Sequence, residues 1–112
     1  IDQLFKTVDV IATPTQPVPA TKFGVDEVDF NGEREVLYNC ITRFTRLLDI
    51  TGHPAISVPS GLTSHTLPAG LQLIAGYHSE KTLIRAAYTF EQECLEDFYK
   101  KRSEICSVYT RT

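Results

Sequence analysis

The sequence contains no methionine, no long apolar run and only three cysteines. No apolar stretch reaches the roughly 20 residues that cross a bilayer, and no signal-like segment stands near the start. The cysteines, Cys40, Cys94 and Cys106, form no C-x-x-C pair, which argues against a disulfide framework or a zinc site. We therefore predict a reducing, cytoplasmic location. Two of these cysteines, Cys40 and Cys94, lie on apolar helical stripes and are expected to act as small buried hydrophobic residues.

A surplus of basic residues is also absent. The formal net charge is -3, and the basic side chains are scattered, so neither nucleic acid nor a membrane surface is a predicted partner. A content of 42% hydrophobic and 22% charged residues is ordinary for a soluble globular protein, and 112 residues suit one domain. The chain opens at Ile1, in what looks like the end of a helix over residues 2–7, and we expect it to be a fragment.

Three short apolar runs predict buried strands at residues 8–12, 55–58 and 71–75. Proline or glycine closes these runs, which are apolar almost throughout rather than alternating, as in strands covered on both faces. The intervening residues 59–68 are predicted to form a loop. This loop is longer than a tight hairpin turn, which leaves antiparallel pairing of the flanking strands open. Gly52 and Gly70 are expected to resist substitution at the strand starts, Gly52 because it suits a positive φ.

Helical periodicity predicts two helices, at residues 33–48 and 79–99. Ser79 is predicted as the N-cap of the second helix, with Glu80 in its first turn. The apolar stripe of the first helix consists of Leu37, Cys40, Ile41, Phe44 and Leu48. The stripe of the second consists of Leu83, Ala87, Phe90, Cys94 and Phe98. Prolines predict an extended loop at residues 13–20, and turn residues predict irregular structure at 21–32. Residues 103–112 carry no clear pattern.

Common catalytic motifs are absent from the sequence: there is no dinucleotide fingerprint, P-loop, zinc-protease helix, nucleophile elbow or calcium loop. The three histidines have no acidic or cysteine partner nearby, so no metal or cofactor site is predicted; His53 is interpreted as a local hydrogen-bonding residue and His65 as an exposed loop residue. Ser57 and Ser60 lack an identifiable base for nucleophilic catalysis. The residues alone indicate a soluble α/β piece without a complete active site.

Five motifs follow one another at suitable separations and cover about residues 4–95. They read V-D-V-I-A-T-P-T at 8–15, T-R-F-T at 42–45, T-G-H-P-A-I-S-V-P-S-G at 51–61, L-P-A-G-L-Q-L-I-A-G at 67–76 and S-E-K-T-L-I-R-A-A at 79–87. Each is weak alone, but in this order they resemble the C-terminal part of an amidase signature family enzyme.

The resemblance implies the C-terminal portion of the amidase signature fold, in which strands of a mixed sheet are covered by helices on both faces. Residues 1–112 would form this portion of a single amidase domain. It also implies amide hydrolysis by a Ser-Ser-Lys triad. Because the chain holds no matching serine pair or lysine, the triad is expected upstream, and the chain alone is expected to be inactive. Its role would be to complete the sheet and one wall of the substrate pocket.

The resemblance also suggests where substrate binds. In glutamine-using A subunits of the tRNA-dependent amidotransferase, an acidic residue before the T-G-x-P-like motif is expected to hold the substrate's amino group. The matching residue here is Thr42, whose hydroxyl cannot match an ammonium electrostatically. We therefore favour an amidase for another small amide, with Thr42, Asn39 and Arg46 on one helical side as substrate-binding residues. The intact enzyme could form a homo-oligomer.

Two alternatives to this amidase hypothesis are open at the level of the sequence. The first is the A subunit of a glutamine-dependent tRNA amidotransferase, which would need partner subunits and tRNA. The second is a non-catalytic, free-standing α/β interaction module.

Overall fold

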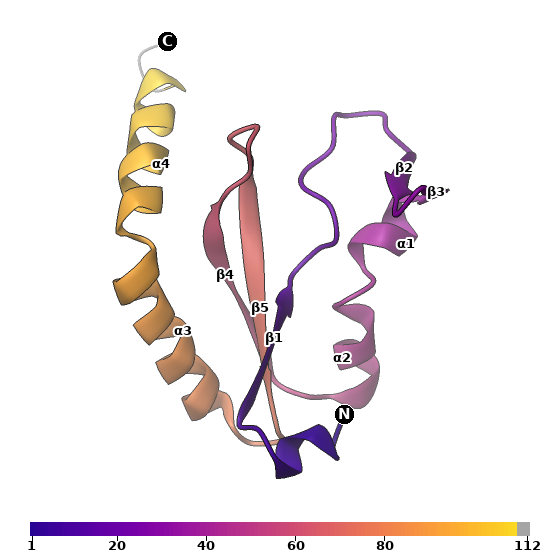
Figure 1. Ribbon diagram of the computed structural model, residues 1–112, viewed down its shortest axis with the longest axis vertical. Helices are drawn as coiled ribbons and strands as arrows, with labels where there is room; N and C mark the ends of the chain where they lie inside the picture. The colour runs from indigo at the N-terminus through magenta and orange to yellow at the C-terminus, as the bar shows by residue number, and fades with distance from the viewer. Residues whose placement is uncertain (110–112) are drawn as a thin grey trace.

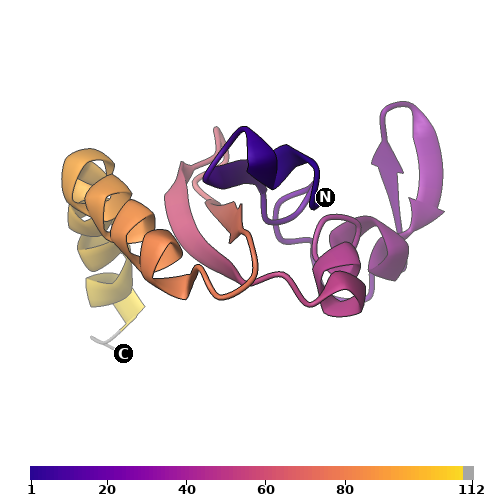
Figure 2. The same cartoon turned by 90° about the horizontal axis from the view of Figure 1, so that it is seen from below.

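The computed structural model describes the backbone of residues 1–109 and the side chains of residues 1–104. A small sheet lies in the middle of the molecule, with helices on both sides of it (Figure 1, Figure 2). The predicted α/β class is therefore confirmed. Within the part of the chain that the structure describes, every helix is too short or too polar to span a bilayer. The side chain of Cys106 lies outside the described part.

Three antiparallel strands form the central sheet, in the order β1 (Val10–Pro14), β5 (Pro68–Ala75), β4 (Ala55–Leu62). All three predicted strands are present, the first with its start two residues later. The predicted burial holds only for residues 72–75 of β5, because β1 and β4 contain only exposed and half-buried residues. The predicted loop at residues 59–68 is wrong for half of its length, because β4 and β5 continue as a hairpin and leave only 63–67 between them. An irregularity between Pro59 and Gly61 accommodates the proline, which lies on an edge strand and has no N–H to donate.

The two faces of this sheet differ in chemistry. Side chains of Leu73 and Ala75 form the core with Leu83 and Ala87 of helix α3 (Glu80–Cys94). Burying a leucine of this kind stabilises the fold by about 1.5–3 kcal/mol. The opposite face carries polar residues, since side chains alternate along a strand. These polar residues are Thr13 in β1, Thr15 just after it, Ser57 on β4 and Gln72 on β5.

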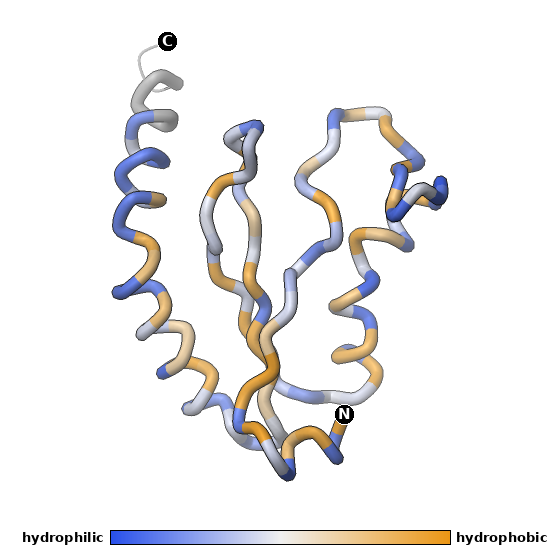
Figure 3. The backbone as a smooth tube through the Cα atoms, in the orientation of Figure 1, coloured by the Kyte–Doolittle hydropathy of each residue, from blue (hydrophilic) through white to orange (hydrophobic). Residues whose placement is uncertain are grey.

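The predicted helix at residues 79–99 is present but divided. Helix α3 ends at Cys94, and α4 (Glu96–Tyr109) begins two residues later in a new direction (Figure 1). The chain turns at Leu95, which is only 1% exposed, whereas Cys94 is exposed. The prediction of a buried Cys94 was wrong, and the next residue, Leu95, is buried at the turn instead. Figure 3 shows the contrast between the apolar strands and the mostly hydrophilic described part of α4.

Ser79 is the N-cap residue of α3, as predicted, but its hydroxyl does not cap the helix. Instead its Oγ donates a weak hydrogen bond of 3.5 Å to the Tyr77 carbonyl. At the other end of the chain, a short 3-10 helix, η1 (Leu4–Lys6), stands where a helix end was predicted. This segment precedes β1.

The largest error of sequence reasoning falls between residues 21 and 51. A hairpin of β2 (Glu27–Phe30) and β3 (Glu33–Val36) replaces the predicted irregular segment and the first turn of the predicted helix. Its turn is Asn31-Gly32, with φ of 56° and 83°, the positive values that a two-residue hairpin turn requires. The remaining helix is split into α1 (Leu37–Ile41) and α2 (Arg46–Thr51).

The helical split between α1 and α2 has a local cause. Thr42 and Thr45 are β-branched, and their hydroxyls donate to the carbonyls of Tyr38 and Thr42. Such side-chain bonds compete with the helical ladder. The predicted apolar side is nevertheless kept, because Cys40 and Leu48 are both buried. Gly52 then ends α2 with a φ of 72°, as its sequence position predicted.

Candidate functional site

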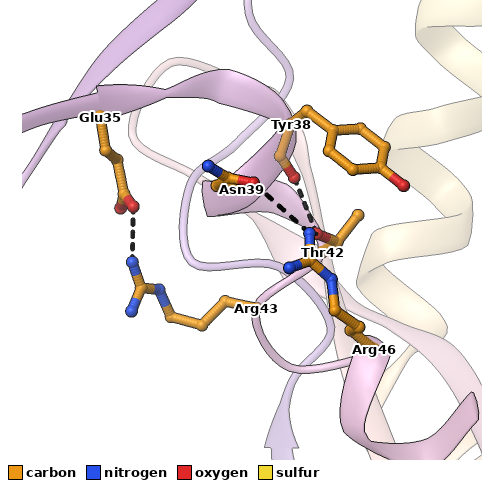
Figure 4. Close-up of polar contacts among 6 residues, drawn as sticks. All are labelled: Glu35, Tyr38, Asn39, Thr42, Arg43 and Arg46. Atoms are coloured by element: carbon orange, nitrogen blue, oxygen red, sulfur yellow. Dashed lines mark hydrogen bonds and ion pairs between the residues drawn. The ribbon is translucent and has the colours of Figure 1, made fainter. Parts of the chain in front are cut away.

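The three residues predicted to bind substrate lie together around the turn between α1 and α2 (Figure 4). Thr42 follows the last residue of α1, and Arg46 is the first residue of α2. The Arg46 Nη2 donates to Thr42 Oγ1 over 2.9 Å and, more weakly, to Asn39 Oδ1 over 3.5 Å. Thr42 in turn donates to the Tyr38 carbonyl over 2.8 Å. Each side chain of this set therefore helps to position the next.

Two arginines of this segment, Arg43 and Arg46, differ in whether a carboxylate lies next to them. The Arg43 Nη2 forms an ion pair of 2.6 Å with Glu35 of β3 and its guanidinium lies over the Phe30 ring, which ties the hairpin to the turn between α1 and α2. Arg46 instead lies over the Tyr38 ring, with its Cζ 5.6 Å from the ring centroid. It forms no ion pair with a carboxylate of residues 1–103. Its positive charge is therefore held in place without being neutralised there.

A cavity of about 610 Å³ opens on the polar side of the sheet, next to the proline-rich loop that follows β1. Across its floor the hydroxyls of Thr15 and Ser57 approach to 2.6 Å. This contact exists because Gly70 has no side chain: a Cβ there would lie 2.7 Å from Thr15 Oγ1 and 3.3 Å from Ser57 Oγ. Neither hydroxyl hydrogen-bonds to a lysine or histidine of the described chain, so a base for nucleophilic catalysis does not contact them.

Gln72 connects the polar side of the sheet to the turn between α1 and α2. Its side chain is almost fully buried, and its Nε2 donates to Thr13 Oγ1 over 3.2 Å and to the Phe44 carbonyl over 3.0 Å. One amide thus joins β5 to β1 and to the turn that carries Thr42. Sequence reasoning missed this residue, although a single polar side chain in the middle of an apolar run was a usable signal, because such a group needs buried partners.

The histidines take structural positions. His53 is buried between the rings of Phe5 and Tyr77, and its Nδ1 lies 2.9 Å from Thr51 Oγ1, which confirms its role as a local hydrogen-bonding residue. Its Nε2 lies 2.9 Å from Asp2 Oδ1, close enough for an ion pair when protonated but without hydrogen-bond alignment. His65 is exposed, as predicted. The described residues contain no cluster of three metal-binding side chains.

Comparison with known proteins decides the family. The family model described as Amidase matches residues 1–84, three quarters of the chain. The chain belongs to the amidase family. The resemblance drawn from the five motifs is confirmed by this match, and the motif at 79–87 runs just past its end.

Among curated relatives, this amidase chain is similar to the A subunits of glutamyl-tRNA(Gln) amidotransferases from several prokaryotes. It is 38% identical to the protein of Carboxydothermus hydrogenoformans over 104 residues, which is 93% of this chain and 20% of that one. It is 43% identical to the protein of Alkaliphilus metalliredigens over 89 residues, 80% of this chain and 17% of that one. The amidase chain therefore spans about one fifth of the length of these relatives.

Comparison with solved structures gives the same family. A bacterial aryl acylamidase of the amidase signature family is 32% identical, with a TM-score of 0.63 over 81% of this chain and 19% of that one. A protein from a study of a vestigial complex and the origins of an s-triazine catabolic enzyme is 25% identical, with a TM-score of 0.77 over 82% of this chain and 20% of that one. The described part of this chain thus has the fold of one part of these larger proteins.

Proposed function

We propose that residues 1–112 form the C-terminal portion of a single amidase domain, in a protein that hydrolyses the carbon-nitrogen bond of a small amide. The chain would complete the sheet and supply one wall of the substrate pocket, with Thr42, Asn39 and Arg46 on that wall. The observation that carries the proposal is the convergence of these three polar side chains within a chain of the amidase family. The likeness to an aryl acylamidase supports an amide as substrate.

The catalytic Ser-Ser-Lys triad is proposed to lie outside this chain. The nearest candidate within it, the Thr15 and Ser57 hydroxyl pair, contacts no lysine or histidine of the described residues that could accept a proton. The chain alone is accordingly proposed to be inactive. Its free thiols at Cys40 and Cys94 support a cytoplasmic location, and the intact enzyme could act as a homo-oligomer without a cofactor.

The second candidate function is that of an amidotransferase A subunit. Identities of 38% and 43% to the A subunits of two glutamyl-tRNA(Gln) amidotransferases favour it. The uncharged Thr42, with the Arg46 cation beside it, disfavours binding of glutamine's amino group at that position. Family membership favours both enzyme hypotheses over a non-catalytic interaction module.

Ammonia release from a panel of amides by the purified full-length protein tests the proposal. We expect release from small aliphatic or aromatic amides in the absence of tRNA and partner subunits. Release from glutamine alone, and only with partner subunits present, would establish the second candidate instead. The isolated chain of residues 1–112, assayed in parallel, should release none. Ammonia release by that chain would contradict the proposed place of the triad.

A further inference from the structure

Arg46 combines a fixed position with an unneutralised charge. Its guanidinium is held by three uncharged groups: the Thr42 hydroxyl, the Asn39 amide oxygen and the Tyr38 ring. Both described hydrogen bonds use Nη2. Since a guanidinium carries five N–H donors in a planar fork, donors remain for another acceptor.

The neighbouring arginine shows what a structural arginine looks like in this segment. Arg43 is paired with the Glu35 carboxylate at 2.6 Å, and this contact fastens the hairpin. Nothing comparable accounts for Arg46, because its partners within residues 1–103 are neutral. An oriented cation with spare donors matches a carboxylate, which a guanidinium binds through two parallel hydrogen bonds.

We propose that Arg46 determines substrate specificity by binding a carboxylate carried on the substrate amide, so that the substrate class is small amides with a free carboxylate group. This inference rests on the proposed function. The Tyr38–Asn39–Thr42 set acts as the cradle that fixes the guanidinium. A substrate ammonium would be repelled at this position, and a neutral group would leave the spare donors of the exposed Arg46 to solvent, whereas a carboxylate would engage them.

Three amides that differ only in one terminal group test this inference with the full-length protein. Glutaramate ends in a carboxylate, pentanamide in a methyl group and 4-aminobutanamide in an ammonium. We expect kcat/KM to fall in that order for the wild type. Arg46→Ala should lower kcat/KM for glutaramate about 10- to 100-fold, mainly through KM, the loss expected for a hydrogen bond to a charged group. The same variant should change kcat/KM for pentanamide by less than about threefold.

Further variants separate specificity from a structural role. Arg46→Lys keeps the charge without the fork and should retain part of the preference for glutaramate, whereas Arg46→Glu should shift the preference to 4-aminobutanamide. Arg43→Ala, three residues away, is the matched control and should leave the order of the three amides unchanged. An equal loss for all three amides in Arg46→Ala, or a wild type that prefers 4-aminobutanamide, would overturn the inference.

A binding measurement distinguishes failure of this inference from failure of the proposed function. If the wild type hydrolyses none of the three amides, the proposed reaction is wrong for these substrates. Calorimetric titration with glutaramate then decides about Arg46 by itself. Weaker binding to Arg46→Ala than to the wild type supports the carboxylate site. Equal binding to both proteins, or no binding to either, refutes it.

Discussion

Replacement of Gly70 by alanine tests the packing beneath the cavity. The new Cβ would lie 2.7 Å from Thr15 Oγ1 and 3.1 Å from Thr15 Cβ, so the threonine or the strand must move. Overpacking of this kind costs about 1–3 kcal/mol, and loss of the 2.6 Å hydroxyl contact with Ser57 adds to it. We expect Gly70→Ala to lower the free energy of unfolding of the full-length protein by about 2 kcal/mol or more.

Urea denaturation measures this change, with Gly76→Ala as the matched control. Gly76 directly follows the same strand, has no positive φ, and its Cβ would meet Phe5 only at an ordinary 3.7 Å. The control should stay within about 0.5 kcal/mol of the wild type. Adding Thr15→Ala to Gly70→Ala removes Oγ1, the atom nearest the new Cβ, and should restore part of the stability. Equal midpoints for Gly70→Ala and the control, or a double variant whose loss is the sum of the two single losses, would refute the steric explanation.

Three further predictions concern a backbone angle, a buried amide and two thiols. Gly52→Ala should lower the free energy of unfolding by about 1 kcal/mol, because an alanine is strained at a φ of 72°, and a urea midpoint equal to that of the wild type would contradict it. Gln72→Leu should cost about 1–3 kcal/mol by leaving the Phe44 carbonyl without its donor, and urea denaturation that shows no loss would mean that this bond is not needed. Iodoacetamide labelling followed by peptide mapping should modify exposed Cys94 before Cys40, since burial and the neighbouring Glu35 raise the pKa of the Cys40 thiol and keep it protonated; equal rates would disprove its burial.

Local sequence pattern was sufficient for the parts of the fold that local chemistry determines. The β-branched run before Pro14 and the apolar run at 71–75 became strands, and the Leu83 and Ala87 stripe became the buried side of α3. The pattern failed for Glu33–Val36, because this short stretch of mostly charged residues fits a helical period as well as a strand period. Pairing with β2 across the Asn31-Gly32 turn made it a strand.

The candidate site divides in the same way. Asn39, Thr42 and Arg46 are spaced by three and four residues, so they stay on one side even though a turn interrupts the helix, and their mutual contacts follow. The contact of Thr15 with Ser57 joins residues 42 positions apart, and that of Gln72 with Thr13 joins residues 59 apart. Such contacts depend on which strands become neighbours, and no local period encodes that order.

The bond from Gln72 to the turn between α1 and α2 ends on a backbone carbonyl. Every amino acid at position 44 supplies that carbonyl, so the attachment of the turn to the sheet is insensitive to side-chain identity at this position. Substitutions at positions 42 and 46, which we propose to contact substrate, would therefore leave this attachment of the turn in place. In the proposed site, the anchor of the turn and the side chains that would contact substrate are therefore different groups, so the second can vary without loss of the first.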